Sequence, residues 1–212
     1  MTQPAPDHRS GLDPDPRPAV VDPNEGAVRA AVGAVRRGDR DAFARLVDLY
    51  QRRLFSLSVM MTRDSSGAEE VTQDAFVRAF VHLDAYDIRR PFYPWLATIA
   101  VRLAQNWLTR RSRNNRREGT ELRPEQDVAT PAADPLSELI ADENDRRLWR
   151  TVAALPYGER TAVILHYRQD MSVRDIARAM SVTSGTVKTM LFRARQRLRR
   201  TAEGGPFGKE RA

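Results

Sequence analysis

Apolar residues recur at helical spacing along most of this chain, and no stretch alternates apolar and polar residues as a β-strand does. After Asp39, steps of three and four connect Phe43, Leu46, Val47, Tyr50, Leu54, Leu57 and Met61. A series with this spacing lies on one face of a helix, and that face must be buried against other elements. The spacing therefore predicts an all-α fold.

Two further helices are predicted in the first half of the chain. Ser65 or Ser66 is the expected N-cap of the first. Its apolar stripe consists of Ala68, Val71, Thr72, Ala75, Phe76, Ala79, Phe80 and Leu83. Pro91 and Pro94 then interrupt the pattern, and Pro94 suits the first turn of a helix that carries both Trp95 and Trp107.

Proline and charge divide the chain into segments. Residues 1–25 contain six of the 13 prolines and few apolar residues, which predicts a disordered tail. Residues 118–136 are again rich in proline, and from 118 to 145 there are nine acidic residues and one basic one. We therefore predict two helical domains, 26–117 and 137–201, joined by a flexible acidic linker over 118–136. A flexible tail is predicted over 202–212, because the glycines and proline after Ala202 do not favour a helix.

The end of the second domain is typical of a helix-turn-helix. Ser172, three residues before Asp175, is expected to cap the first helix, and Thr183 the second. The apolar residues that join the two helices are Ile176, Ala177, Met180, Val187 and Leu191. Ser181 stands in the turn, where a residue other than glycine is tolerated if its φ stays negative.

The last helix has the charge expected of a DNA-binding surface. Residues 183–200 contain six Lys and Arg and no acidic residue, whereas a merely solvated helix usually mixes both signs. The second helix of a helix-turn-helix enters the major groove with its early residues near the bases. The candidate duplex-binding residues are Ser184, Thr186, Lys188, Thr189, Phe192, Arg193, Arg195 and Arg197.

A second cationic region mixes arginine with aromatic residues. Residues 88–117 contain eight Arg and no acidic residue, together with several aromatic side chains. Bases of single-stranded nucleic acid stack on aromatic rings while cations follow the backbone, so this composition favours single-strand binding. The alternative is that Trp95 and Trp107 are core residues and the arginines only contact phosphate. The candidate residues are Tyr93, Trp95, Thr98, Arg102, Asn106, Arg110 and Arg111.

Composition excludes several other classes of protein. The net charge is +7, cysteine is absent, and no apolar run is long enough to span a membrane, so a cytoplasmic protein without membrane insertion is expected. The three histidines are scattered, and Glu69 and Glu70 are adjacent and point in different directions on a helix. We therefore predict no enzymatic activity, no metal site, no cofactor and no small-molecule substrate.

Four short sequences in order resemble extracytoplasmic-function sigma factors of bacterial RNA polymerase. These are Asp74–Phe80 (DAFVRAF), Trp95–Ala100 (WLATIA), Gly185–Lys188 (GTVK) and Phe192–Arg195 (FRAR). The resemblance implies that the first domain binds core RNA polymerase and melts the minus-ten element of promoter DNA, while the second reads the minus-thirty-five element as duplex. It implies that Glu70, Gln73, Asp74 and Arg78 meet the polymerase, and that an anti-sigma protein is the usual inhibitor.

One departure from the family and one rival function remain open at this point. Arg102 stands where the family commonly has Asn, so the pocket for a flipped minus-ten base is expected to differ. The rival is a stand-alone helix-turn-helix regulator, which would explain residues 137–200 and leave the arginine and aromatic residues of 88–117 without a role.

Overall fold

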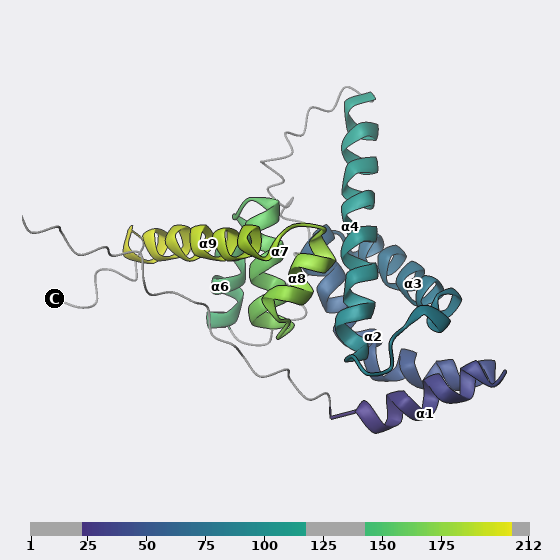
Figure 1. Ribbon diagram of the computed structural model, residues 1–212. Coiled ribbons are helices and arrows are strands. Elements are labelled where there is room, and N and C mark those ends of the chain that lie inside the picture. Colours follow the sequence, from purple (N-terminus) through teal and green to yellow (C-terminus); the bar gives the residue numbers. More distant parts are fainter. Residues whose placement is uncertain (1–22, 118–142, 205–212) are drawn as a thin grey trace, which may run out of the picture.

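The computed structural model describes residues 23–117 and 143–204 (Figure 1). These described residues form helices and turns and contain no strand, which confirms the predicted all-α fold. The elements are α1 (Glu25–Arg36), η1 (Arg40–Ala42), α2 (Phe43–Thr62), α3 (Ser65–Val81), η2 (Leu83–Ala85), α4 (Phe92–Arg117), α6 (Glu143–Ala153), α7 (Tyr157–Val163), the π-helical η3 (Ile164–Arg168), α8 (Val173–Met180) and α9 (Ser184–Gly204). The predicted linker and most of both predicted tails lie outside the described residues.

Helices α2, α3 and α4 pack against one another and form the core of an N-terminal group, with α1 against α2. The predicted apolar face of α2 is buried as expected: Phe43, Leu46, Tyr50, Leu54, Leu57 and Met61 are in the core. Aromatic rings fill the space between α2 and the start of α4. The ring centroid of Tyr50 lies 5.5 Å from that of Phe92 and 5.8 Å from that of Tyr93.

The N-cap of α3 differs from the prediction. The cap is Asp64, whose Oδ1 accepts a hydrogen bond from the Gly67 amide at 2.7 Å, whereas Ser65 and Ser66 are already helical. Asp64 has the extended backbone (φ −147°, ψ 124°) that an N-cap needs. Asp, Ser and Thr cap helices comparably well, so the sequence alone did not favour the correct one of three neighbouring candidates.

Helix α1 holds the connection between α3 and α4. Nη2 of Arg36 donates to the carbonyl oxygen of Leu83 at 2.9 Å and to that of Tyr86 at 2.5 Å. The Tyr86 hydroxyl in turn donates to the carbonyl of Arg90. Side-chain donors thus reach backbone carbonyls on both sides of Ala85 and fix the loop that leads into α4.

The C-terminal group contains the predicted helix-turn-helix, α8 and α9, packed against α7. Both predicted caps are confirmed: the Ser172 hydroxyl accepts from the Asp175 amide at 3.1 Å, and that of Thr183 accepts from the Thr186 amide at 3.1 Å. The packing stripe of α9, which includes Val187 and Leu191, is buried. Helix α9 ends at Gly204, three residues beyond the predicted end of the domain at 201.

The turn of the helix-turn-helix contradicts the expected backbone of Ser181. Its φ is 56° and its ψ 41°, which is the left-handed region and not the negative φ that would suit serine. In this conformation the amides of Ser181 and Val182 reach the last carbonyls of α8: the Val182 amide donates to Ala177 at 3.0 Å. The turn therefore keeps the geometry that glycine usually provides, at the cost of backbone strain.

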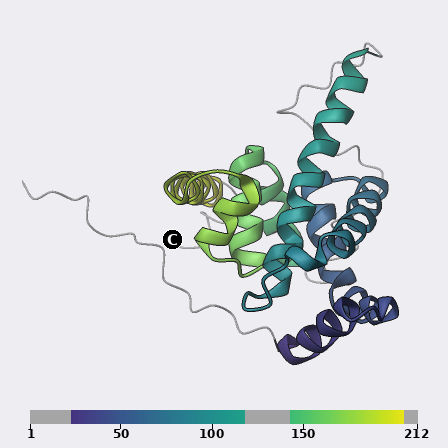
Figure 2. The same ribbon diagram turned by 45° about the vertical axis from the view of Figure 1, so that its right-hand side comes forward.

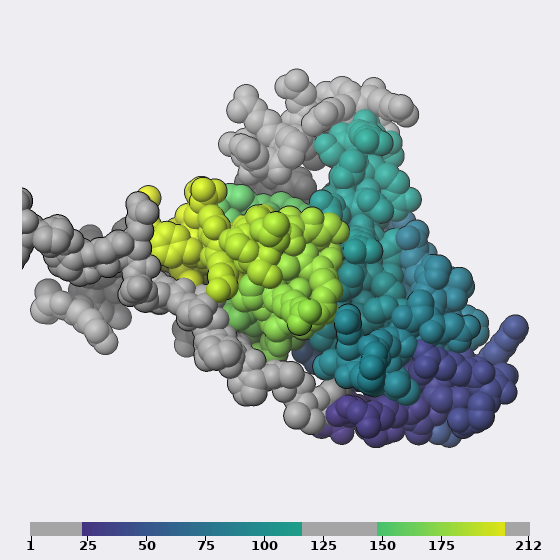
Figure 3. Space-filling model, in the orientation of Figure 1, coloured from purple at the N-terminus to yellow at the C-terminus, as the bar shows by residue number. Residues whose placement is uncertain are grey.

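The two groups of helices lie side by side. Helix α8 packs along α4, and both ribbon views show the two helices adjacent (Figures 1 and 2). In the space-filling view the surface of the C-terminal group meets that of α4 directly (Figure 3). The C-terminal half of α4 projects beyond this contact (Figure 2).

Candidate nucleic-acid and polymerase interfaces

The outer face of α9 presents the side chains predicted for duplex binding. Lys188, Thr189, Phe192 and Arg193 are all exposed, on the side of α9 away from the buried Val187–Leu191 stripe. Ser184 and Thr186 are exposed in the first turn, where the helix dipole favours an anion. This part of the prediction has the geometry that a groove-binding helix requires.

Among the predicted α9 residues, two arginines make contacts within the chain. Arg197 Nε lies 3.1 Å from Oε2 of Glu159 on α7, an ion pair without good hydrogen-bond direction, and the Glu159 side chain is nearly buried. Arg195 Nε donates to the Leu191 carbonyl at 3.3 Å. The sequence of α9 alone could not reveal the partner of Arg197, because Glu159 belongs to another helix. The Arg197 side chain therefore contacts α7 and is also exposed to solvent.

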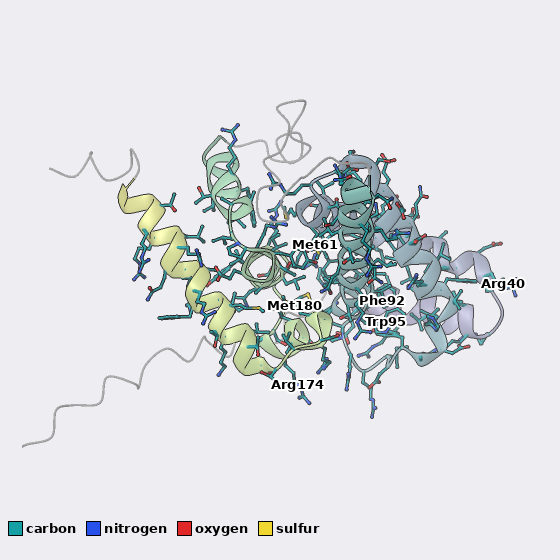
Figure 4. All side chains as sticks on the ribbon, turned by 90° about the horizontal axis from the view of Figure 1, so that it is seen from above. Arg40, Met61, Phe92, Trp95, Arg174 and Met180 are labelled. Atoms are coloured by element: carbon teal, nitrogen blue, oxygen red, sulfur yellow. The ribbon has the colours of Figure 1, made fainter. Side chains whose placement is uncertain are left out.

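The predicted single-strand face of α4 is partly exposed and partly packed. Arg102, Asn106 and Arg110 are exposed along one side of the helix. Trp95 is half-buried, with its ring centroid 5.1 Å from that of Tyr86 and 5.4 Å from that of Phe92. Figure 4 shows Phe92 and Trp95 together near the start of α4. The Thr98 hydroxyl donates to the carbonyl of Pro94, within the helix.

Tyr93 does not reach the surface on which it was placed from sequence. Its side chain is 2% exposed, and burial raises the pKa of its hydroxyl, a shift that the nearby Arg53 cation opposes. The Tyr93 hydroxyl donates to Oε1 of Gln169 at 2.7 Å. A pattern within one helix could not have revealed this, because Gln169 belongs to the C-terminal group.

The arginines before α4 are less available than the sequence suggested. Asp87 lies immediately before the acid-free stretch, and Arg89 Nε donates to its Oδ1 at 2.9 Å while Arg90 pairs with its Oδ2 at 3.6 Å. The hydrogen bond from Arg89 lowers the pKa of Asp87 to about 2. These two cations are therefore paired with a neighbouring carboxylate.

Helix α3 presents the four residues that the resemblance assigns to polymerase binding. Glu70, Gln73, Asp74 and Arg78 are exposed, while the neighbouring Val71, Ala75 and Phe76 are buried. Sequence reasoning missed two apolar residues on the same face. Val77 and Val81 are 61% and 66% exposed, and their spacing from Asp74 and Arg78 places all four on one side of the helix. Exposed valines beside charged residues are typical of a protein-binding surface.

Residues predicted for polymerase binding and residues predicted for single-strand binding line the same open cleft of about 390 Å³ between α3 and α4. Its lining residues are Asp74, Arg78, Leu103, Asn106, Thr109, Arg110 and Arg113. Beside it, Glu70 accepts hydrogen bonds from Arg110 at 2.6 Å and from the Trp107 indole at 3.0 Å. Arg111 pairs with Asp64 at 2.6 Å. The two predicted surfaces therefore border the same cleft and are joined by the Glu70–Arg110 ion pair.

The described residues offer no three His, Cys, Asp or Glu side chains grouped as metal ligands. Buried His166 instead faces the Met171 carbonyl, 3.3 Å from its Nδ1. Every helix within the described ranges is too short or too polar to cross a bilayer.

Comparison with known protein families gives two matches, one within each group of helices. The Sigma-70 region 2 family matches residues 46–114, and the Sigma-70 region 4 family matches residues 145–198. The first match runs from within α2 to within α4, and the second runs from within α6 to within α9.

Curated relatives and solved structures agree with these families. The ECF RNA polymerase sigma factor SigW of Bacillus subtilis (strain 168) is 30% identical over 181 residues, 83% of this chain and 97% of that protein. The ECF sigma-E factor of Haemophilus influenzae is 34% identical over 175 residues, 79% of this chain and 91% of that protein. The fold resembles CnrH, solved with the cytosolic domain of CnrY, with a TM-score of 0.60, 22% identity and coverage of 84% and 98%. It also resembles the sigma factor RpoE of Bartonella quintana, solved with the anti-sigma factor NepR, with a TM-score of 0.63, 21% identity and coverage of 76% and 96%. The chain belongs to the extracytoplasmic-function RNA polymerase sigma factors, a family of transcription initiation factors.

Proposed function

We propose that this sigma factor binds core RNA polymerase through α3, reads the minus-thirty-five element as duplex through α9, and holds the melted minus-ten strand on α4. Residues 26–117 and 137–201 are the proposed units for these tasks, joined by residues 118–136. The observation that carries the proposal is the presence of two separate cationic helical faces, one on each group, in a chain of this family. A stand-alone helix-turn-helix regulator would use only the α9 face.

The chemistry of the two faces differs in the way that the two tasks require. The α9 face combines Lys188 and Arg193 with hydroxyls and the exposed ring of Phe192, which suits base edges and phosphates of a duplex. The α4 face combines an aromatic residue, two arginines and the amide of Asn106, which suits an unstacked base and its backbone. The α3 face, with Val77 and Val81, suits a protein partner instead.

Two partners and a location follow from the same proposal. Core RNA polymerase and promoter DNA are the direct partners, and both place the protein in the cytoplasm. The presence of an anti-sigma factor on the Bartonella quintana sigma factor supports the same kind of inhibitor for this chain. The proposed activity involves no catalysis by the chain itself, no cofactor and no small-molecule substrate.

The test is transcription with reconstituted polymerase. Holoenzyme with Arg102→Ala or Asn106→Ala should bind duplex promoter normally and open it poorly, measured by 2-aminopurine fluorescence in the minus-ten element. Double charge reversal, Asp74→Arg with Arg78→Asp, should weaken assembly with core polymerase and leave the circular dichroism spectrum unchanged. Wild-type opening by both α4 variants would refute the minus-ten assignment, and unchanged assembly would refute the α3 assignment.

A further inference from the structure

We propose that Glu159 on α7 takes the place of a DNA phosphate at Arg197 of α9, and that this pairing limits how tightly the chain binds duplex DNA of any sequence. The inference rests on the proposed binding of duplex by α9 and adds a residue outside α9 that sets its strength. A carboxylate and a phosphate offer a guanidinium the same kind of charged oxygen. Contacts to phosphate carry no direct information on base sequence, so the effect concerns affinity alone.

The cations of α9 lie in two rows, along the two edges of its outer face. One row, at steps of seven and four, consists of Lys188, Arg195 and Arg199. The other row, at steps of four and three, consists of Arg193, Arg197 and Arg200. The exposed side chains of Thr189 and Phe192 lie between the rows. Because a helix in the major groove has a phosphate backbone on each side, each row is placed to contact one backbone.

The second row is interrupted at its middle member. Nε of Arg197 lies 3.1 Å from Oε2 of Glu159, whereas within the described part of the chain neither Arg193 nor Arg200 pairs with a carboxylate. All three arginines are exposed. A negative charge from another helix therefore stands at the one position of this edge where a phosphate would otherwise meet Arg197.

The two partners differ in how freely they can move. The side chain of Glu159 is 10% exposed and that of Arg197 58%. Helix α7 packs closely on α9 (Figure 1), and a Cβ added at Gly158 would lie 3.2 Å from Cε of Met190 on α9. Packing thus fixes the carboxylate, while the guanidinium can leave it for a phosphate. An ion pair with so exposed a partner is weak, so the expected effect on affinity is a few-fold.

Binding of the full chain to a fluorescent DNA duplex of mixed sequence, measured by anisotropy over a range of salt concentrations, tests the pairing. Glu159→Gln keeps the shape of the side chain and removes its charge. The affinity at low salt should rise about threefold, and the slope of log affinity against log salt should steepen by about one, because one more phosphate is neutralised. Glu69→Gln makes the same change of charge at an exposed position of α3 and should leave the slope unchanged.

The gain must also depend on Arg197. Adding Glu159→Gln to Arg197→Ala should give no gain, whereas adding it to Arg200→Ala should give the full gain. With Glu159 intact, Arg200→Ala should flatten the salt slope by about one and Arg197→Ala by less. This last comparison changes only exposed side chains of α9, so it stands even if the buried position tolerates no substitution. Circular dichroism of each variant should match that of wild type.

The outcomes separate this inference from the proposed function. Loss of slope in Arg200→Ala without any gain in folded Glu159→Gln would overturn the role of Glu159 and leave duplex binding by α9 standing. Equal losses in Arg197→Ala and Arg200→Ala, or a gain that persists without Arg197, would overturn it as well. Wild-type affinity and slope in both arginine variants would mean that α9 does not bind duplex, and the proposed function would fail together with the inference. None of these measurements needs polymerase or a known promoter.

Discussion

At the scale of single residues, Ser181 adopts a backbone conformation that serine does not favour. Its left-handed φ of 56° costs an L-residue roughly 1–2 kcal/mol, and the turn between α8 and α9 imposes it. Ser181→Gly should therefore raise the free energy of unfolding by up to about 1 kcal/mol, after the greater entropy of unfolded glycine is subtracted. Ser181→Val should lower it by about 1–2 kcal/mol, because β-branched side chains fit this region worst. Urea unfolding measures both, and equal stability of the two variants would contradict the strain.

At Gly67 the backbone of α3 lies so close to the Trp107 ring that only glycine fits without a shift. A Cβ at this position would lie 2.3 Å from Cζ2 of Trp107, and the ring is held in place by its hydrogen bond to Glu70. Gly67→Ala should therefore destabilise the fold by about 1–3 kcal/mol. The matched control is Gly26→Ala on α1, where a Cβ meets nothing within 4 Å and helix propensity favours Ala by up to about 1 kcal/mol. Thermal unfolding should move in opposite directions for the two variants, and a shift of both in one direction would be inconsistent with this packing.

At the scale of helices, Asp64 both caps α3 and ties it to the far half of α4. Burial alone would raise the pKa of its carboxyl, but hydrogen bonds from the Gly67 amide and from Arg111 outweigh it, and the pKa is lowered. A lowered pKa means that the ionised carboxyl stabilises the fold above its unfolded value near 3.9. This contribution is lost as the pH falls through the folded value.

Two substitutions separate the roles of Asp64. Asp64→Ala should cost about 1–2 kcal/mol at neutral pH, because the cap and the ion pair are both lost. Asp64→Asn keeps a capping oxygen and loses the charge, so its cost should be smaller. In urea titrations the difference between wild type and Asp64→Asn should shrink in acid, as the wild-type carboxyl becomes protonated. A difference that stayed constant with pH would show that Arg111 contributes nothing through charge.

At the scale of the whole molecule, the contact between the two groups of helices joins them into one folding unit, although each group matches a separate family region. Gln169 and Arg53, which are 116 residues apart in sequence, couple the two groups together with the packing of α8 on α4. We therefore expect a single calorimetric transition for free wild-type chain. Gln169→Lys should divide it into two transitions, one for each group, while Arg168→Ala should leave one. Two transitions in wild type would contradict the coupling.

The sequence by itself determined the helices and the type of each surface. Apolar residues at steps of three and four predicted α2, α3, α4, α8 and α9, because one face of each must be buried. Acid-free stretches predicted the cationic faces of α4 and α9, because local charge needs no knowledge of distant contacts. Caps at Ser172 and Thr183 were equally local, whereas the choice of Asp64 over its serine neighbours depended on the backbone and on Arg111.

The tertiary structure decided which members of each surface are available. Tyr93 is buried by Gln169, Arg197 is held by Glu159, and Glu70 is joined to Arg110, each through a partner on another element. Periodicity within one helix specifies a face and says nothing about which neighbour covers it. Only the packing of α8 on α4 shows that the surface proposed for the melted strand is in part already occupied, because that contact depends on the relative position of two groups that the sequence places far apart.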